Sequence, residues 1–267
     1  MIYRQAGPVP YYQFVNLAAQ KRVKHYVFTR IGGVSRSPFA SLNVGHTVGD
    51  DDGAVEANHG LVYEATGISE EHVVTAHQVH GTRVATVRRG TGSLHEGTDA
   101  LVTDRPGLLL MLRFADCVPV MLYDPVHKAV GLIHSGRLGT LECIVARTVD
   151  RMGQEYGSRP ADLIAGIGPS IGPCCYQVGP EVGVEVKARL PDAGRVLITQ
   201  TDGSLHLDLW EAIRQQLVSA GVDDIEGSGL CTACHVDEFF SHRAEQGHTG
   251  RFAALIGLRP DGKSGKP

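Results

Sequence analysis

Three side chains that bind metal ions in proteins stand at the ends of apolar segments or at breaks within them. His80 directly precedes Gly81, His134 lies two residues before Gly136, and Cys117 interrupts an apolar run. Glycine at such points lets the backbone approach a ligand closely. Two imidazoles and one thiolate form a three-ligand set that leaves a coordination position open, as in catalytic zinc sites, and copper accepts the same donors.

The spacing of these three residues does not by itself distinguish a metal site from ordinary core residues. The three are far apart in the sequence, and no compact pattern such as His-Glu-x-x-His supports them. A buried cysteine and two hydrogen-bonded core histidines would produce the same pattern. From the residues alone, a catalytic metal centre and a plain core both remain open.

A second cysteine pattern is Cys231-Thr-Ala-Cys234-His235, which matches the attachment motif of haem c. Haem attachment requires export, and the N-terminal residues lack the basic and apolar regions of a signal peptide. A zinc knuckle would need a second spaced pair, whereas Cys174 and Cys175 are adjacent. We therefore predict an incidental or structural cysteine pair.

Arginines and a glycine-rich turn suggest anion binding. The turn at residues 167–176 could expose several N–H groups, and Arg243 and Arg251 lie in a glycine-containing segment. Arg30 precedes Gly32. Guanidinium groups suit phosphate and carboxylate oxygens, although exposed arginines are more often plain surface residues.

Composition excludes several classes of partner. The 267 residues carry a formal net charge of −4 and only 6% aromatic residues. A nucleic-acid binder would show a basic footprint, and a membrane-surface protein would show a polybasic patch. The longest apolar run, residues 107–112, is too short to span a bilayer. We expect a cytoplasmic, monomeric protein that acts on a small molecule.

The apolar pattern predicts strands alternating with helices in one domain over residues 1–267, with 259–267 as a disordered tail. An apolar face from Leu138 to Met152 predicts one helix, and Asp208 is expected to cap another. The expected strands lie within 23–29, 72–87, 108–123, 129–134 and 163–167. The helix capped by Asp208 covers 209–220, and one further helix covers 55–66. Continuous apolar strands indicate sheets covered on both faces.

Ordered motifs run over most of the chain. They are Thr29-Arg-Ile-Gly-Gly-Val-Ser35, Ser41-Leu-Asn-Val-Gly45, Val48-Gly-Asp50, His77-Gln-Val-His-Gly81, Thr98-Asp-Ala100, Ala115-Asp-Cys-Val-Pro119, Ile167-Gly-Pro-Ser-Ile171, Cys174-Cys-Tyr176, Phe239-Phe-Ser-His-Arg243 and Thr249-Gly-Arg251. In these motifs the chain resembles the YfiH-like family, also called the laccase-domain or multicopper polyphenol oxidase family, which includes FAMIN-type purine nucleoside phosphorylases.

This resemblance implies an α+β fold, a four-layer α-β-β-α sandwich with mixed sheets. It implies that His80, Cys117 and His134 are the catalytic metal ligands, for Zn²⁺ or Cu²⁺. It also implies a substrate pocket lined by Arg30, Asn43, Gln78 and Arg243.

The activity that the resemblance implies is metal-dependent purine nucleoside phosphorylase and adenosine deaminase chemistry. The substrates would be phosphate and adenosine, inosine, guanosine or methylthioadenosine. Two alternatives are a copper-dependent, laccase-like polyphenol oxidase and a Cys117-dependent amidase that edits peptidoglycan precursors. Phenol oxidation normally uses several coppers, and the sequence offers three strong ligands. A fourth reading is a metal-stabilised binding module.

One segment departs from the family pattern. The family usually shows His-Ala-Gly-Trp-Arg-Gly, whereas this chain reads His134-Ser-Gly-Arg-Leu-Gly139. If the family arginine faces substrate, Leu138 cannot replace it, but Arg137 can be an alternative cation. The departure concerns substrate choice and leaves the three ligands intact.

Overall fold

The computed structural model describes residues 1–89 and 94–260. Within these ranges the strands form two large mixed sheets and one small sheet. The larger sheet contains, in spatial order, β1 (Ile2–Ala6), β2 (Val9–Gln13), β3 (Val23–Phe28), β16 (Phe252–Leu258), β8 (Leu109–Phe114), β4 (Val73–Ala76) and β6 (Leu94–His95). The second contains β15 (Asp224–Gly227), β11 (Ile164–Ile167), β9 (Val118–Asp124), β10 (Ala129–Ser135), β7 (Ala100–Thr103) and β5 (Val84–Thr86).

The small sheet and the helices complete the description. The small sheet has the order β12 (Gln177–Val178), β14 (Leu205–Leu207) and β13 (Leu197–Thr199). The helices are α1 (Val15–Ala18), α2 (Asp52–Thr66), α3 (Arg137–Leu141), α4 (Ile144–Tyr156), α5 (Pro180–Arg189), α6 (Ala193–Val196) and α7 (Leu209–Ser219), with 3₁₀ turns at Glu70–His72 and Pro160–Asp162. In the described part of the chain, no helix is both long and apolar enough to span a bilayer.

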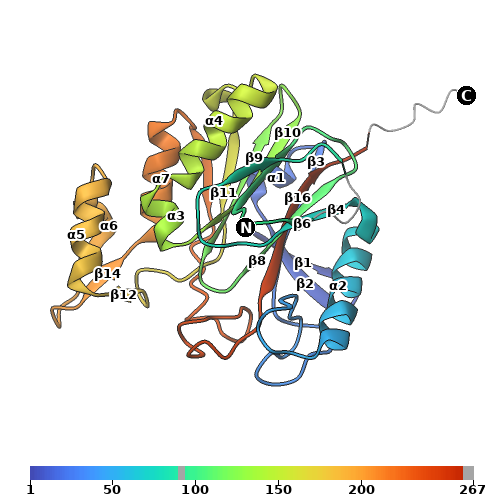
Figure 1. Ribbon diagram of the computed structural model, residues 1–267, viewed down its shortest axis with the longest axis horizontal. Coiled ribbons are helices and arrows are strands. Elements are labelled where there is room, and N and C mark those ends of the chain that lie inside the picture. Colours follow the sequence, from blue (N-terminus) through green and yellow to red (C-terminus); the bar gives the residue numbers. More distant parts are fainter. Residues whose placement is uncertain (90–93, 261–267) are drawn as a thin grey trace, which may run out of the picture.

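Three apolar clusters hold four layers together. One lies between the two large sheets, where Leu112 of β8 and Leu132 of β10 belong to the same cluster. A second packs α4 and α7 on the outer face of the β9–β10 sheet, and a third packs α2 on the other sheet. Figure 1 shows α2 on one side of the molecule and α4 and α7 on the other. The predicted α-β-β-α sandwich with mixed sheets is therefore confirmed.

The inner strands are continuous apolar runs because both of their faces are covered. Every residue of β9, β10 and β16 is buried. The expected strands within 108–123 appear as β8 and β9, and those within 72–87 as β4 and β5. The Asp208 carboxylate accepts the N–H of Glu211 at 3.0 Å and caps α7, as predicted.

The single helix predicted from Leu138 to Met152 is wrong. The chain forms α3 and α4, separated by Cys143 in a left-handed conformation with φ of 59°. Leu138 is 48% exposed instead of facing the core with Met152. Leu141 of α3 still packs in the same apolar cluster as Val145 and Met152 of α4, so the predicted apolar face holds on both sides of the break except at Leu138.

The structure describes only part of the residues to which the domain and tail predictions refer. Residues 261–267 of the expected tail lie outside the described residues. Arg259 is described, and its backbone N–H donates to the carbonyl of Arg22 at 2.8 Å. The one-domain organisation over 1–267 stays a prediction.

Candidate metal centre and substrate pocket

The three predicted ligands come together where the two large sheets meet. His80 lies in the loop after β4, Cys117 directly precedes β9, and His134 is the penultimate residue of β10. Their ligand atoms all lie within 4.8 Å of one another. His134 is buried, Cys117 is partly buried and His80 is exposed, so the cluster opens to one side. An open side is what a catalytic ligand set requires.

Asp99 holds the loop of His80 and the ring of His134 in position through hydrogen bonds. Its buried carboxylate accepts N–H bonds from Val79, His80 and Gly81 at 3.2, 2.9 and 2.8 Å. It also lies 2.9 Å from Nδ1 of His134. A carboxylate can only accept, so Nδ1 carries the proton and Nε2 is left as the ligand atom. Burial opposes ionisation, but these hydrogen bonds lower the pKa of Asp99 below its usual value.

Cys117 and His134 shift each other's pKa. Burial alone would raise the pKa of the Cys117 thiol, but the two histidines outweigh burial and lower it to about 6. Burial would also lower the pKa of His134, but the Cys117 thiolate and Asp99 raise it to about 9. The metal-free site therefore favours a thiolate, which is the form of cysteine that binds metals. One thiolate, two imidazoles and a carboxylate behind one imidazole fit zinc, and copper is a second candidate.

Gly136 leaves the space that the cluster occupies. A Cβ atom at this position would lie 2.9 Å from Sγ of Cys117 and 3.1 Å from Cδ2 of His80. Its backbone has φ of −83°, which any residue can adopt, so the need for glycine here is steric. By contrast, His80 and Asp116 have positive φ values of 60° and 81°. Non-glycine residues in this region carry backbone strain that often accompanies functional sites.

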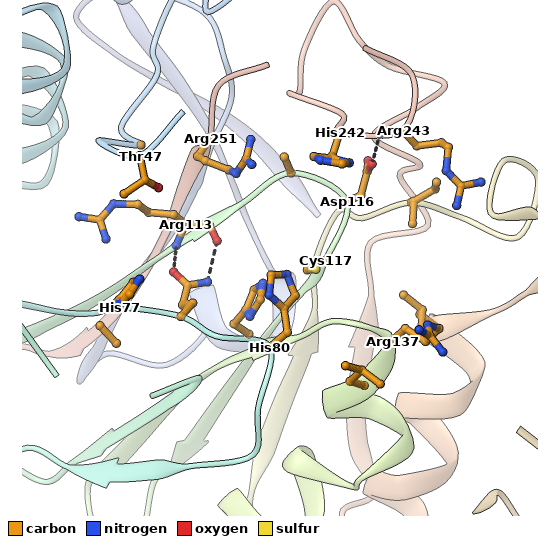
Figure 2. A pocket seen from close by; sticks show the side chains of 18 of the residues that line it. Thr47, His77, His80, Arg113, Asp116, Cys117, Arg137, His242, Arg243 and Arg251 are labelled. Atoms are coloured by element: carbon orange, nitrogen blue, oxygen red, sulfur yellow. Dashed lines mark hydrogen bonds between the residues drawn. The ribbon is translucent and has the colours of Figure 1, made fainter. Parts of the chain in front are cut away.

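The open side of the cluster faces a cavity of about 700 Å³. This volume is within the range of cavities that bind small molecules. Figure 2 shows Arg113 and Arg251 on one side of His80 and Cys117, with Arg137 and Arg243 on the other. Besides the three ligands, the lining includes Gln78, His77, Arg113, Asp116, Arg137, Leu138, Tyr176, Arg243 and Arg251.

The four arginines make the cavity cationic. Arg137 pairs with Glu185 at 2.8 Å, whereas the other three form no ion pair with a described residue. Arg113 donates to the Val44 carbonyl at 2.8 Å, and burial lowers its pKa. Burial likewise lowers the pKa of Arg251, which interacts electrostatically with Cys117 and Asp116. Four guanidinium groups around one cavity favour the binding of an anion.

Two of the residues predicted to bind substrate line this cavity. Gln78 exchanges two hydrogen bonds with the backbone of Arg113, at 2.8 and 2.9 Å, which ties the His80 loop to β8. Arg243 holds its guanidinium over the ring of Tyr176 and donates to the Gln177 carbonyl at 2.9 Å. Their roles toward substrate stay predictions.

The other two predicted residues lie outside the lining. Arg30 pairs with Glu245 at 3.0 Å and donates to two backbone carbonyls. Asn43 is buried, and its Oδ1 accepts the N–H of Arg251 at 2.8 Å. In this structure both therefore support neighbouring loops, and direct contact with substrate stays a prediction.

Sequence reasoning missed Asp99 and Arg113 as site residues, and it offered Arg251 only as a candidate for anion binding. Arg113 had a signal, because a charge inside an otherwise apolar strand is unusual. Arg251 follows a glycine, but nothing in its spacing points to Cys117. Asp99 stands in a family-like motif, yet only the fold brings it to His134.

Fold and site together define a four-layer α+β protein with a His-Cys-His ligand set in a cationic cavity. Residues 24–259 match the family described as multi-copper polyphenol oxidoreductase laccase. The chain belongs to this family, and the predicted YfiH-like resemblance is confirmed.

Three relatives illustrate the similarity. The purine nucleoside phosphorylase YlmD of Geobacillus stearothermophilus is 41% identical over 87% of this chain and 89% of its own. A purine nucleoside phosphorylase of Deinococcus radiodurans is 38% identical over 98% of both chains. The crystal structure of the Bacillus licheniformis protein YfiH has a TM-score of 0.89 and 39% identity, covering 96% of this chain and 99% of its own.

Proposed function

We propose that this protein is a metal-dependent purine nucleoside phosphorylase that acts on adenosine, inosine, guanosine or methylthioadenosine. The observation that carries the proposal is the cationic cavity beside the His-Cys-His ligand set. Arg113, Arg243 and Arg251 line it, and none of the three forms an ion pair within 4.0 Å with a described carboxylate. Relatives that bear the name purine nucleoside phosphorylase match nearly the whole chain.

Phosphorolysis needs an anion held against the ribose and a leaving purine. Arg243 and Arg251 flank Cys117 and, together with Arg137 of the same cavity, would hold phosphate oxygens, since guanidinium groups suit oxyanions. Phosphate then attacks C1′ as the bond to the purine breaks, and the cationic ribose is stabilised by its anionic neighbour. A divalent cation bound by the three ligands would supply Lewis acidity to a substrate oxygen.

Adenosine deamination is the finer part of the proposal and needs a group that moves a proton. Asp116 lines the cavity beside Cys117 and accepts bonds from Thr232 at 2.6 Å and from the N–H of Arg243 at 2.7 Å. Each of its oxygens keeps a second lone pair. His77 also lines the cavity, but it is exposed and paired with Glu96 at 2.9 Å. Asp116 is therefore the better candidate.

The deciding experiment follows the purine product with and without phosphate. Zinc-loaded protein is incubated with each nucleoside, and bases and nucleosides are separated by chromatography. Free base formed only with phosphate supports phosphorolysis, and inosine formed from adenosine without phosphate supports deamination. No turnover of any nucleoside at any metal loading would overturn the proposal. Arg4→Gln, an exposed substitution on β1, is the matched control for arginine variants.

A Cys-dependent amidase is the second candidate, because the geometry also offers a nucleophile and a base. His134 and His80 lower the pKa of Cys117, and Asp99 orients His134, as in nucleophile–base–orienter sites. A metal-bound thiolate is a poor nucleophile, so this reaction needs an empty site. Chelator should abolish phosphorolysis but increase amide hydrolysis. A copper-dependent oxidase would instead consume oxygen with phenols when loaded with copper.

A further inference from the structure

Four cysteines from two distant segments form a second cluster outside the cavity. Cys174 and Cys175 lie between β11 and β12, and Cys231 and Cys234 follow β15. The four Sγ atoms lie within 4.8 Å of one another, and all four thiols are free. Sγ of Cys234 is 3.5 Å from that of Cys174 and 3.4 Å from that of Cys175. The function proposed above uses none of these thiols.

Backbone hydrogen bonds hold the two segments in register. Ser170 donates its N–H to the Leu230 carbonyl at 3.2 Å, and Thr232 donates to the Ser170 carbonyl at 3.0 Å. The N–H of Gly172 points to Sγ of Cys231 at 3.2 Å. An N–H bond to sulfur favours the thiolate form, which binds metals. The cluster is thus part of the folded framework and not a chance encounter of surface side chains.

We propose that Cys174, Cys175, Cys231 and Cys234 bind a structural zinc ion. Tetrahedral zinc with Zn–S bonds of about 2.3 Å places its sulfurs about 3.8 Å apart, close to the separations seen here. Four cysteine ligands complete the coordination shell, so this ion has no open position. The site therefore differs from the His-Cys-His cluster, which keeps one side open.

The adjacent pair and the Cys-x-x-Cys pair explain why the sequence alone did not predict this site. An adjacent pair is unusual for a zinc knuckle, and the two pairs are separated by three helices and four strands. The parallel pairing of β11 with β15 and the β-bridge between residues 170 and 231 bring them together.

The zinc would stabilise one wall of the cavity. Tyr176 follows the first cysteine pair, and Arg243 follows the second pair along the chain. The guanidinium of Arg243 lies over the Tyr176 ring, 5.2 Å from its centroid. Joining the two segments would hold these groups in position, so loss of the ion would loosen this wall.

Metal analysis of the full-length protein tests the proposal. Protein is purified under reducing conditions with zinc supplied and then dialysed. We expect about two zinc ions per chain, one for each ligand cluster. Cys174→Ser combined with Cys234→Ser should lose one ion and keep the other. Cys143→Ser is the matched control, since Cys143 belongs to neither cluster, and should keep both.

The complementary variant keeps the test valid if the cysteine variants fail to fold. His80→Ala combined with His134→Ala removes the open site and leaves all four thiols unchanged. This variant should still bind one zinc ion, and cobalt in its place should show the intense thiolate charge-transfer absorption of a four-sulfur site. A folded variant that binds no zinc would overturn the proposal, whatever the activity of the open site.

Alkylation gives a third readout on the wild-type protein. With zinc bound, iodoacetamide should label the four cysteines at least tenfold more slowly than after chelation, as read by peptide mass spectrometry. Equal labelling rates in both states would contradict a zinc site. Loss of two hydrogen masses with no zinc retained, under the same reducing conditions, would assign the cluster to a disulfide instead.

Discussion

The carboxylate of Asp99 lies 2.9 Å from Nδ1 of His134, and both side chains are buried. The same carboxylate accepts the backbone N–H of His80 at 2.9 Å. Asp99 therefore orients one ligand through its ring and a second through its backbone. A single residue outside the ligand set controls the geometry of the open site.

Replacing Asp99 by asparagine should weaken zinc binding at the open site by roughly 10–100-fold. The amide keeps the shape of the carboxylate, but its NH₂ group meets N–H donors that only an oxygen can satisfy. The zinc affinity of the His-Cys-His cluster is measured by competition with a chromophoric chelator. The chain carries no other substitution. Asp150→Asn on the exposed face of α4 is the control. Equal affinities for the two variants would rule out this role of Asp99.

Gly136→Ala should disrupt the open metal site while leaving the backbone unstrained. The new methyl group would lie 2.9 Å from Sγ of Cys117, so the sulfur or the His80 ring must move. We expect zinc to be lost from this site and activity to fall at least tenfold. Gly60→Ala in α2, where a Cβ meets nothing within 4 Å, should leave both unchanged. Zinc content and circular dichroism distinguish a damaged site from a damaged fold.

Arg137→Leu should raise the KM for phosphate by roughly 10-fold, the effect of losing one charge-assisted hydrogen bond of about 1.5 kcal/mol. Arg137 lines the cavity at the point where the family usually has an arginine one residue later. Leu138→Ala is the matched variant, because Leu138 lines the same cavity but has no charge. It should raise the KM for nucleoside and leave that for phosphate unchanged. The opposite pattern would assign no anion role to Arg137.

Stability should fall in mild acid because His25 is buried in its neutral form. Burial lowers the pKa of His25 to about 4, and its Nε2 accepts the N–H of Phe14 at 2.8 Å, which only the neutral ring can do. Between pH 6.5 and 4 the unfolded chain binds a proton that the folded chain does not. The stabilisation is therefore complete above the unfolded pKa and is lost as the pH falls toward 4.

His25→Gln should flatten this pH dependence. A shift from 6.5 to about 4 makes His25 responsible for about 2 kcal/mol of the stability lost between pH 7 and pH 5. Denaturant unfolding at the two pH values measures the difference for each protein. His72→Gln, at an exposed position, is the control and should keep the wild-type dependence. A variant that loses as much stability as wild type would contradict the assignment to His25.

Much of the element pattern was readable before the fold was known. The inner strands β9 and β10 are covered on both faces and are therefore continuous apolar runs. Such a run can be recognised from neighbouring residues in the sequence. The cap of Asp208 on α7 was predictable for the same reason, since it joins residues three apart. The break at Cys143 was not, because a left-handed cysteine leaves no mark on the periodicity.

The sequence by itself determined which side chains can act: two histidines and a cysteine at the ends of apolar segments, a family of motifs, and a set of arginines. Only the tertiary structure decided which of them meet. It placed Asp99 within hydrogen-bonding distance of His134 and Arg251 near Cys117. It also brought the four sulfur atoms of the two cysteine pairs together, and it left Arg30 outside the cavity lining. The physical reason is that chemistry depends on distances of a few ångströms, and those distances arise from the packing of strands far apart in the chain.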